Sequence, residues 1–142
     1  MKNKLIIFEG IDGTGKSTTV KLLRDELSKR GINVVCFEEI ESKSEGFNIL
    51  KAFVKKETPI ESSLFYYIAS SIYKSKIINE LLKTKWVICD RYVYSTIAYH
   101  LSKGVDPKTI PDIKTLPITS PDFFFLLKTD EDTRINRLNK QT

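Results

Sequence analysis

A short segment near the amino terminus combines glycines, a lysine and hydroxyl side chains in a spacing that can hold a polyphosphate. Residues Gly10–Ser17 read Gly-Ile-Asp-Gly-Thr-Gly-Lys-Ser and fit the pattern G-x-x-x-x-G-K-[ST]. Glycines let backbone N–H groups turn inward and approach anionic oxygens, at the positive end of the helix that follows. We therefore expect this loop to bind nucleotide phosphates, with Lys16 reaching the β- and γ-phosphates and the Ser17 hydroxyl coordinating Mg²⁺. The residues expected to bind the nucleotide are Gly10, Ile11, Asp12, Gly13, Thr14, Gly15, Lys16, Ser17 and Thr18.

A carboxylate and a guanidinium stand together at the end of another apolar segment. Asp90 closes the run Lys85–Asp90 (KWVICD), where a carboxylate that faces the metal ion would sit, usually through water. Arg91 follows it, and its planar fork can clamp two oxygens of the transferred phosphoryl group. The alternatives are an Asp90 that caps the next helix at the surface and an Arg91 that is solvated. We expect Ser17 and Asp90 to be the metal-binding residues.

The elements that position these residues are predicted from the pattern of apolar side chains. Short apolar runs predict buried strands at Lys4–Glu9, Asn33–Phe37, Lys85–Asp90 and Asp122–Leu127. Helical periodicity or a polar helical segment predicts helices at Lys16–Arg30, Gly46–Lys56, Ser62–Lys83, Tyr92–Lys103 and Glu131–Lys140, and the acidic stretch Glu38–Glu45 reads as a loop. Strands that alternate with helices, each strand a continuous apolar run, favour an α/β fold with a parallel sheet covered on both faces. Ligands of such sheets bind beyond the carboxyl ends of the strands, where the phosphate loop and Asp90 both lie.

The composition fits a single cytoplasmic domain over residues 1–142, with 41% hydrophobic and 29% charged residues. The net charge of +5 is spread evenly rather than gathered in a polybasic block, so we expect a small anionic ligand and no nucleic acid. The apolar runs are too short for a membrane span, and no secretory signal is apparent. Cys36 and Cys89 are expected to be buried free thiols. The single histidine, His100, is expected to be a surface or hydrogen-bonded residue.

Three segments carry a resemblance in their order and spacing: FEGIDGTGKST (Phe8–Thr18), KWVICDRYVYSTIAY (Lys85–Tyr99) and PDFFFLL (Pro121–Leu127). Together they resemble the thymidylate kinase family of nucleoside-monophosphate kinases. The resemblance implies the three-layer P-loop NTPase fold, with strand order 2-3-1-4. It also implies ATP and Mg²⁺ as cofactors, and transfer of the γ-phosphoryl group of ATP to dTMP to give dTDP. Members of the family are usually dimers, so a homodimer is expected, packed through helices within Gly46–Lys83.

The resemblance also implies roles for individual side chains. The acid of the loop, here Asp12, would accept a hydrogen bond from the 3′-hydroxyl of the acceptor, and the thymine ring would stack on Phe65. The implied acceptor-binding residues are Asp12, Phe65, Arg91, Ser95, Thr96 and Tyr99. The implied catalytic residues are Lys16, Arg91, Asp90 and, from the start of the lid region, Arg134 and Arg137. The alternatives are ordinary packing or helix-capping roles for the acceptor-binding set and a solvated face for the two lid arginines.

Three departures from the family pattern bear on the activity. Ala69 stands where the family has an arginine that contacts the base. The end of the second strand reads Phe37-Glu-Glu-Ile-Glu41 instead of carrying the arginine that holds the acceptor phosphate, and Lys43 is the candidate replacement. The sequence stops at Thr142, just inside the lid region, so we expect this chain to lack the fifth strand and the loop that holds adenine in relatives.

The second departure supports a rival interpretation. Carboxylates at this position repel a monophosphate, whereas a deoxynucleoside kinase of the same fold needs a base there to take the proton of a 5′-hydroxyl. Glu38 or Glu39 would be that base. A further alternative is an inactive relative that binds nucleotide without turnover.

Overall fold

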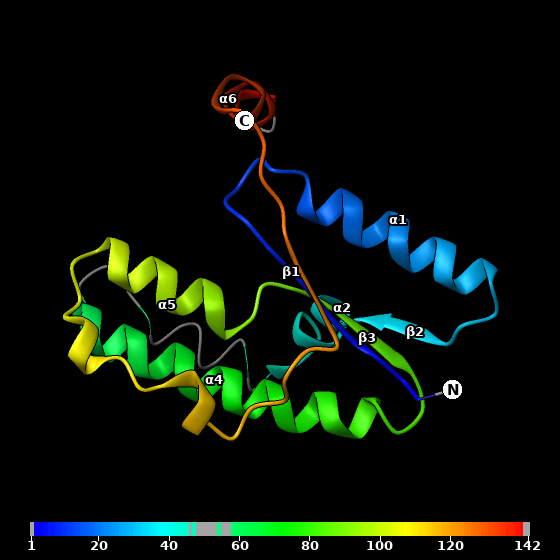
Figure 1. Ribbon diagram of the computed structural model, residues 1–142, viewed down its shortest axis with the longest axis horizontal. Coiled ribbons are helices and arrows are strands. Elements are labelled where there is room, and N and C mark those ends of the chain that lie inside the picture. Colours follow the sequence, from blue (N-terminus) through cyan, green and yellow to red (C-terminus); the bar gives the residue numbers. More distant parts are fainter. Residues whose placement is uncertain (1, 46, 48–53, 55–57, 141–142) are drawn as a thin grey trace.

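The computed structural model describes residues 2–45, 47, 54 and 58–140, and these residues form an α/β fold around one parallel sheet (Figure 1). The strands are β1 (Leu5–Glu9), β2 (Val34–Cys36), β3 (Trp86–Asp90) and β4 (Phe123–Leu126). All pairs are parallel, and the order is β2-β3-β1-β4. The predicted strands and their order are confirmed.

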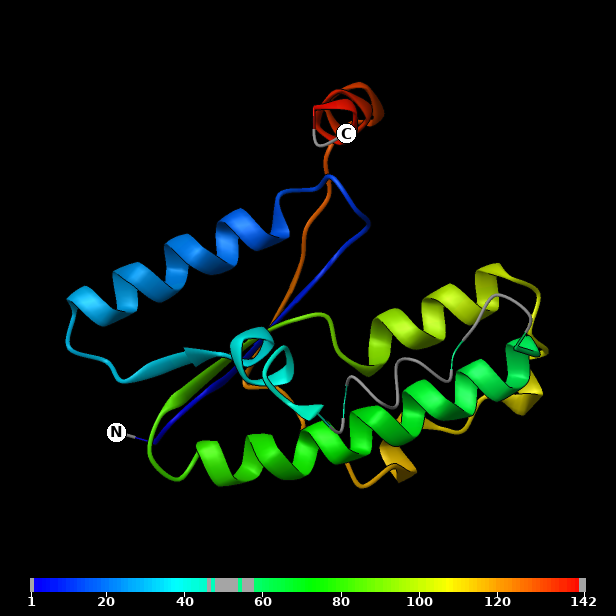
Figure 2. The ribbon, with the colours of Figure 1, turned by 180° about the vertical axis from the view of Figure 1, so that it is seen from behind.

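Helices cover both faces of the sheet, which explains why the inner strands are apolar at successive positions. Leu5 and Ile7 of β1 face a core that includes side chains of α4 (Ile60–Leu81) and α5 (Val93–Ser102). Ile6 and Phe8 face the opposite core, which is closed by Val20, Leu23 and Leu27 of α1 (Lys16–Lys29). Figures 1 and 2 show α1 on one side of the sheet and the α4–α5 pair on the other.

The segment after β2 differs from the prediction of a loop over Glu38–Glu45. It begins with the short helix α2 (Phe37–Glu41), which follows β2 without a break. Glu38 and Glu39 lie in the first turn of α2, where the positive end of the helix dipole favours carboxylates. The acidic character that suggested a loop is therefore also suited to a helix start. The next predicted helix, Gly46–Lys56, lies largely outside the described residues.

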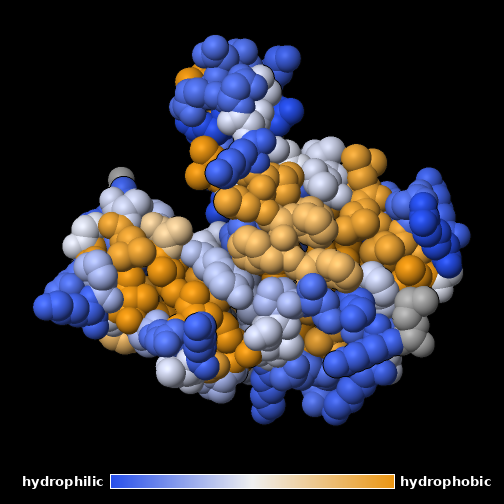
Figure 3. Space-filling view, viewed as in Figure 1, coloured by the Kyte–Doolittle hydropathy of each residue, from blue (hydrophilic) through white to orange (hydrophobic). Residues whose placement is uncertain are grey.

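Strand β4 forms one edge of the sheet and is more exposed than the prediction of a buried strand implied. Phe123, Phe124 and Phe125 are each 45% exposed and Leu126 is 56% exposed. The ring of Phe125 stacks on Phe8 at 5.1 Å between centroids, so one face of β4 has an aromatic neighbour while its surface remains open. Figure 3 shows apolar surface gathered over this edge. Beyond β4 the chain rises to α6 (Glu131–Asn139), which stands above the end of β1.

The cysteines lie in the interior of the protein. Cys36 and Cys89 are buried free thiols, as expected, and burial raises the pKa of Cys36 to about 11. Among the helices that the structure describes, none has the length and apolar character of a bilayer span.

The central strand predicts a sharp difference between two aliphatic substitutions. Ile7→Ala removes a fully buried side chain between the strands and α4, and should lower the free energy of unfolding by about 2–5 kcal/mol. Leu22→Ala, in α1 but 65% exposed, should change it by less than about 0.5 kcal/mol. Urea unfolding followed by circular dichroism measures both values. Equal losses in the two variants would contradict the core described above.

Candidate active site

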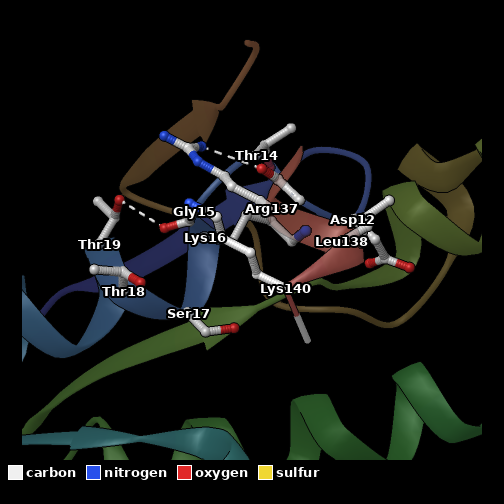
Figure 4. Close-up of a pocket in the computed structure, with 11 residues that line it drawn as sticks. Asp12, Thr14, Gly15, Lys16, Ser17, Thr18, Thr19, Arg137, Leu138 and Lys140 are labelled. Atoms are coloured by element: carbon white, nitrogen blue, oxygen red, sulfur yellow. Dashed lines mark hydrogen bonds between the residues drawn. The ribbon is translucent and has the colours of Figure 1, made fainter. Parts of the chain in front are cut away.

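The predicted phosphate loop wraps around a cavity at the amino terminus of α1. Gly15, with φ of 91°, turns the chain into the helix in the left-handed region that favours glycine. At Gly10 a Cβ atom would lie 2.5 Å from the carbonyl oxygen of Leu127, so only glycine fits there. The cavity has a volume of about 690 Å³, within the usual range for ligand pockets. Residues 12–19 line it together with Arg137, Leu138 and Lys140 of the α6 segment (Figure 4).

Lys16 is buried in this loop, and its ammonium is bound to a neutral backbone carbonyl group. Its ammonium donates to the carbonyl oxygen of Ile11 at 3.1 Å. Burial lowers the pKa of Lys16 below its ordinary value, and the nearby charge of Arg91 lowers it further. A phosphate oxygen is a stronger acceptor than a carbonyl for this group because the hydrogen bond is then assisted by both charges. The loop thus holds a cation whose best partner would be an anion in the cavity.

Ser17 and Asp90, the two residues predicted to bind a metal ion, lie in contact with each other. The Ser17 hydroxyl donates to Oδ2 of Asp90 at 3.1 Å. The other carboxylate oxygen of Asp90 is buried and has no hydrogen-bond partner among the described residues. A hydroxyl and a carboxylate are oxygen ligands of the kind that Mg²⁺ prefers, and Mg²⁺ completes its shell with water and substrate phosphates rather than a protein cage. The pair therefore fits Mg²⁺, with Asp90 Oδ1 open to a metal-bound water.

Arg91 sits in a strained backbone position that aims its side chain at the loop. Its φ of 73° makes it the one described non-glycine residue with a left-handed backbone. The guanidinium donates to Oδ1 of Asp12 at 2.7 Å and to the Ser95 hydroxyl at 3.1 Å. The backbone N–H of Arg91 donates to the carbonyl oxygen of Phe8 at 2.9 Å. The strain is therefore offset by contacts on both the main chain and the side chain.

Glu9 holds the segment that follows Arg91, and the sequence prediction missed it. Its buried carboxylate accepts from the backbone N–H of Tyr92 at 2.8 Å and of Ser95 at 3.3 Å, and from the Ser95 hydroxyl. A buried carboxylate that bonds two backbone amides fixes those amides because leaving any of the groups unpaired is costly. The signal available in the sequence was a glutamate at the end of an otherwise apolar strand.

A second cavity, of about 780 Å³, opens on the other side of Asp12 and Arg91. Of the predicted acceptor-binding residues it gathers Asp12, Arg91, Ser95, Thr96 and Tyr99. Asp12 lines both cavities, so the two spaces adjoin at this carboxylate. His100 also lines this cavity and is buried, and its ring nitrogens contact the carbonyl oxygen of Thr96 at 2.6 Å and the Ser63 hydroxyl at 3.2 Å. This matches the expectation of a hydrogen-bonded histidine.

The aromatic wall of the second cavity differs from the implied one. Phe65 is 51% exposed and is not among the residues that line the cavity. Tyr67, two positions on along α4, lines it, together with Ser70 and Ser71. Residues two apart on a helix point in widely different directions, so Phe65 and Tyr67 cannot share one face. In this structure the aromatic ring that α4 offers to the cavity is that of Tyr67.

The two arginines of α6 differ in their contacts. Arg137 donates to the carbonyl oxygen of Gly13 at 3.1 Å and lines the phosphate-loop cavity. Figure 4 shows it extended across the loop. Arg134 forms an ion pair with Glu131 on its own helix and packs over Gly13 without lining the cavity. The structure thus brings Arg137 to the site and leaves Arg134 beside it.

Glu38 and Glu39, the first two carboxylates after β2, are engaged away from both cavities. Glu38 accepts from the backbone N–H of Asp90 at 2.7 Å, and burial raises its pKa. Glu39 pairs with Arg24 of α1 at 2.5 Å. Neither lines a cavity described above. Lys43, the candidate phosphate ligand, is exposed and also does not line them.

The chain as a whole is similar to proteins of one family. The thymidylate kinase family model matches residues 8–142. A probable thymidylate kinase of Methanocaldococcus jannaschii is 36% identical over 139 residues, which cover 96% of this chain and 70% of the relative. The thymidylate kinase of Brachyspira hyodysenteriae is 34% identical over 140 residues, which cover 97% and 69%. The chain belongs to the thymidylate kinase family.

The fold agrees with that of a solved member of the thymidylate kinase family. The crystal structure of thymidylate kinase from Ehrlichia chaffeensis matches with a TM-score of 0.73 and 28% identity, over 99% of this chain and 79% of that one. The resemblance that the sequence carried is therefore confirmed in both sequence and fold.

A substitution of Glu9 tests whether this carboxylate orients Arg91 through the segment that follows it. Glu9→Gln keeps the size of the side chain but removes its charge and replaces one acceptor oxygen by a donor. The amides of Tyr92 and Ser95 should then relax, and kcat for phosphoryl transfer should fall about 10-fold or more because misplaced groups lose much of their effect. Glu26→Gln, which alters only an exposed ion pair with Arg30, should leave kcat unchanged. Steady-state kinetics decides, and equal rates in both variants would refute the orienting role.

Proposed function

We propose that this protein transfers the γ-phosphoryl group of ATP to dTMP, giving dTDP, and that it uses Mg²⁺. The observation that carries the proposal is the pair of adjoining cavities: one lies inside a phosphate loop, the other is lined by Arg91 and aromatic side chains, and Asp12 belongs to both. Such an arrangement suits a donor and an acceptor that meet end to end.

The donor side supplies charge stabilisation. The backbone amides of the loop and the ammonium of Lys16 hold the phosphates, and Arg137 reaches the same space from α6. When bound between Ser17 and Asp90, Mg²⁺ would neutralise charge on the phosphate oxygens. Lys16 and Arg91 would stabilise the charge that is spread over the transferred group in a loose transition state.

The acceptor side supplies orientation. Asp12 would accept a hydrogen bond from the acceptor's sugar hydroxyl, and Arg91 would contact phosphate oxygens while Ser95 steadies its guanidinium. Thr96, Tyr99 and Tyr67 would surround the sugar and base. A monophosphate is already an anionic nucleophile, so no general base is needed.

The nucleoside kinase alternative requires a base beside the acceptor hydroxyl. Glu38 is bound to a backbone amide and Glu39 to Arg24, and both are absent from the walls of the acceptor cavity. The contacts of these two carboxylates therefore favour a monophosphate acceptor.

Family membership also supports proposals on the domain organisation, oligomeric state and location of the protein. We propose a single domain over residues 1–142 that acts as a cytoplasmic homodimer, with neither nucleic acid nor membrane as partner. Phe65 and Tyr73 of α4 are 51% and 47% exposed, which supports packing of this helix against a second subunit.

A substrate panel tests the reaction. The protein with ATP and Mg²⁺ should consume dTMP and leave thymidine unchanged, as measured by chromatographic separation of the nucleotides. Consumption of thymidine alone would establish the nucleoside kinase instead. ATP binding by calorimetry, without transfer to any of the four deoxynucleoside monophosphates or to thymidine, would establish an inactive binding protein.

Lys16 tests the donor site. Lys16→Ala should lower kcat by about 10²- to 10³-fold, because a charge that stabilises the transition state is lost while the backbone loop remains. Lys21→Ala changes an exposed lysine of the same helix and should leave kcat unaltered. Thermal unfolding of both variants checks that the fold is retained. A Lys16→Ala enzyme as fast as the unmodified protein would rule out the assigned role.

A further inference from the structure

We infer that Lys74 of α4 binds the phosphate of the acceptor nucleotide and thereby makes this site select a monophosphate over a nucleoside. The inference rests on the proposed function, because it concerns the acceptor of that reaction. The family has a phosphate-binding arginine at the end of β2, where this chain has Phe37 and Glu38. In this protein the positive charge for the acceptor phosphate would come from helix α4 instead.

Lys74 is placed unusually for a lysine. It lies in the middle of α4, its residue surface is 8% exposed, and it lines the second cavity beside Arg91 and Asp90. Lysines are rarely so buried unless they are paired. Its ammonium lies 4.5 Å from the centroid of the Phe37 ring, so the aromatic face fixes it at the end of β2.

The polar partners of Lys74 leave it capacity for an anion. An ammonium has three donors. Among the described residues, Lys74 Nζ donates to the carbonyl oxygen of Arg91 at 3.3 Å and lies 3.6 Å from Oε2 of Glu41. The first distance is long for a hydrogen bond and the second exceeds that range. Glu41 is 39% exposed, so its carboxylate can turn into water at small cost when a stronger anion arrives.

The second cavity has more carboxylates than cations on its described walls, so an anionic ligand needs the charge of Lys74. These walls carry the carboxylates of Asp12, Glu41 and Asp90, against the cations Arg91 and Lys74. Arg91 already contacts Asp12 at 2.7 Å. A nucleoside monophosphate adds about 2 negative charges near neutral pH. Without Lys74 the acceptor phosphate would face an excess of carboxylates with one engaged guanidinium, which disfavours its binding.

Binding measurements on Lys74 variants test the inference directly. By calorimetry, Lys74→Met should weaken dTMP binding about 10- to 100-fold, the usual effect of losing a charged hydrogen bond. Thymidine, which lacks the phosphate, should bind within about 2-fold of its original affinity. Lys74→Arg should retain most of the dTMP affinity. Lys76→Met, an exposed lysine of the same helix, is the matched control and should change neither.

Glu41 provides a second test, and its single variant leaves Lys74 in place. Glu41→Gln frees the ammonium and removes a repulsive carboxylate, so dTMP should bind more tightly while thymidine is unaffected. A lysine that merely neutralises Glu41 predicts instead that the gain, which then comes only from the lost carboxylate, persists when Lys74 is also replaced. Adding Lys74→Met to Glu41→Gln should abolish the gain in dTMP affinity. This double variant removes both charges of the ion pair, so the loss cannot come from an unpaired glutamate.

The outcomes separate the inference from the proposed function. Equal losses for dTMP and thymidine in Lys74→Met, an unchanged dTMP affinity, or a loss caused by Lys43→Met instead would each overturn it. Absence of dTMP binding to the unmodified protein would overturn it as well. If dTMP binds in the expected pattern but receives no phosphoryl group from ATP, the proposed reaction fails and the Lys74 assignment stands.

Discussion

The parallel pairing of β1 with β3 is the contact on which the whole site depends. Its register sets Phe8 opposite Asp90, so the residues that leave the two strands emerge side by side. One strand continues into the phosphate loop and the other into Arg91, and the Ser17–Asp90 and Asp12–Arg91 contacts join them. Because a shift of one residue would turn each side chain to the opposite face, the core on both faces of β1 also fixes the geometry of the site.

Two carboxylates, the buried Glu9 and the half-buried Glu38, hold the loop after β3 in place. Glu38 bonds the amide of Asp90, and Glu9 bonds the amides of Tyr92 and Ser95, so the strained residue Arg91 is anchored on both sides. A left-handed backbone at a non-glycine residue costs about 1–3 kcal/mol. Hydrogen bonds to charged groups contribute about 1.5–3 kcal/mol each, enough to offset that cost. The carboxylates of the site thus divide into those that orient the backbone, Glu9 and Glu38, and those that line the ligand cavities, Asp12, Glu41 and Asp90.

Local patterns could be predicted from the sequence, and contacts between distant elements could not. The phosphate loop was found because its chemistry is carried by backbone and glycine at fixed spacing, and the strands because each is an apolar run. The aromatic side chain of α4 that enters the cavity was not accessible from the sequence, because Phe65, Tyr66 and Tyr67 are consecutive and point to different sides of the helix. The exposure of β4 was also missed, because an edge strand here has the same apolar composition as the central one.

The acidic segment after β2 shows that carboxylates close in sequence need not lie in one repulsive cluster in the fold. In the sequence the carboxylates of Glu38, Glu39 and Glu41 stand close together, where they would repel one another. In the fold each meets a different partner: Glu38 the amide of Asp90, Glu39 the guanidinium of Arg24, and Glu41 the ammonium of Lys74. Burial also raises the pKa of Glu38 above its ordinary value. Only Glu41 lines the acceptor cavity, and it is the one whose partner can be taken over by a phosphate. The feature that suggested a hydroxyl acceptor is therefore compatible with an anionic one.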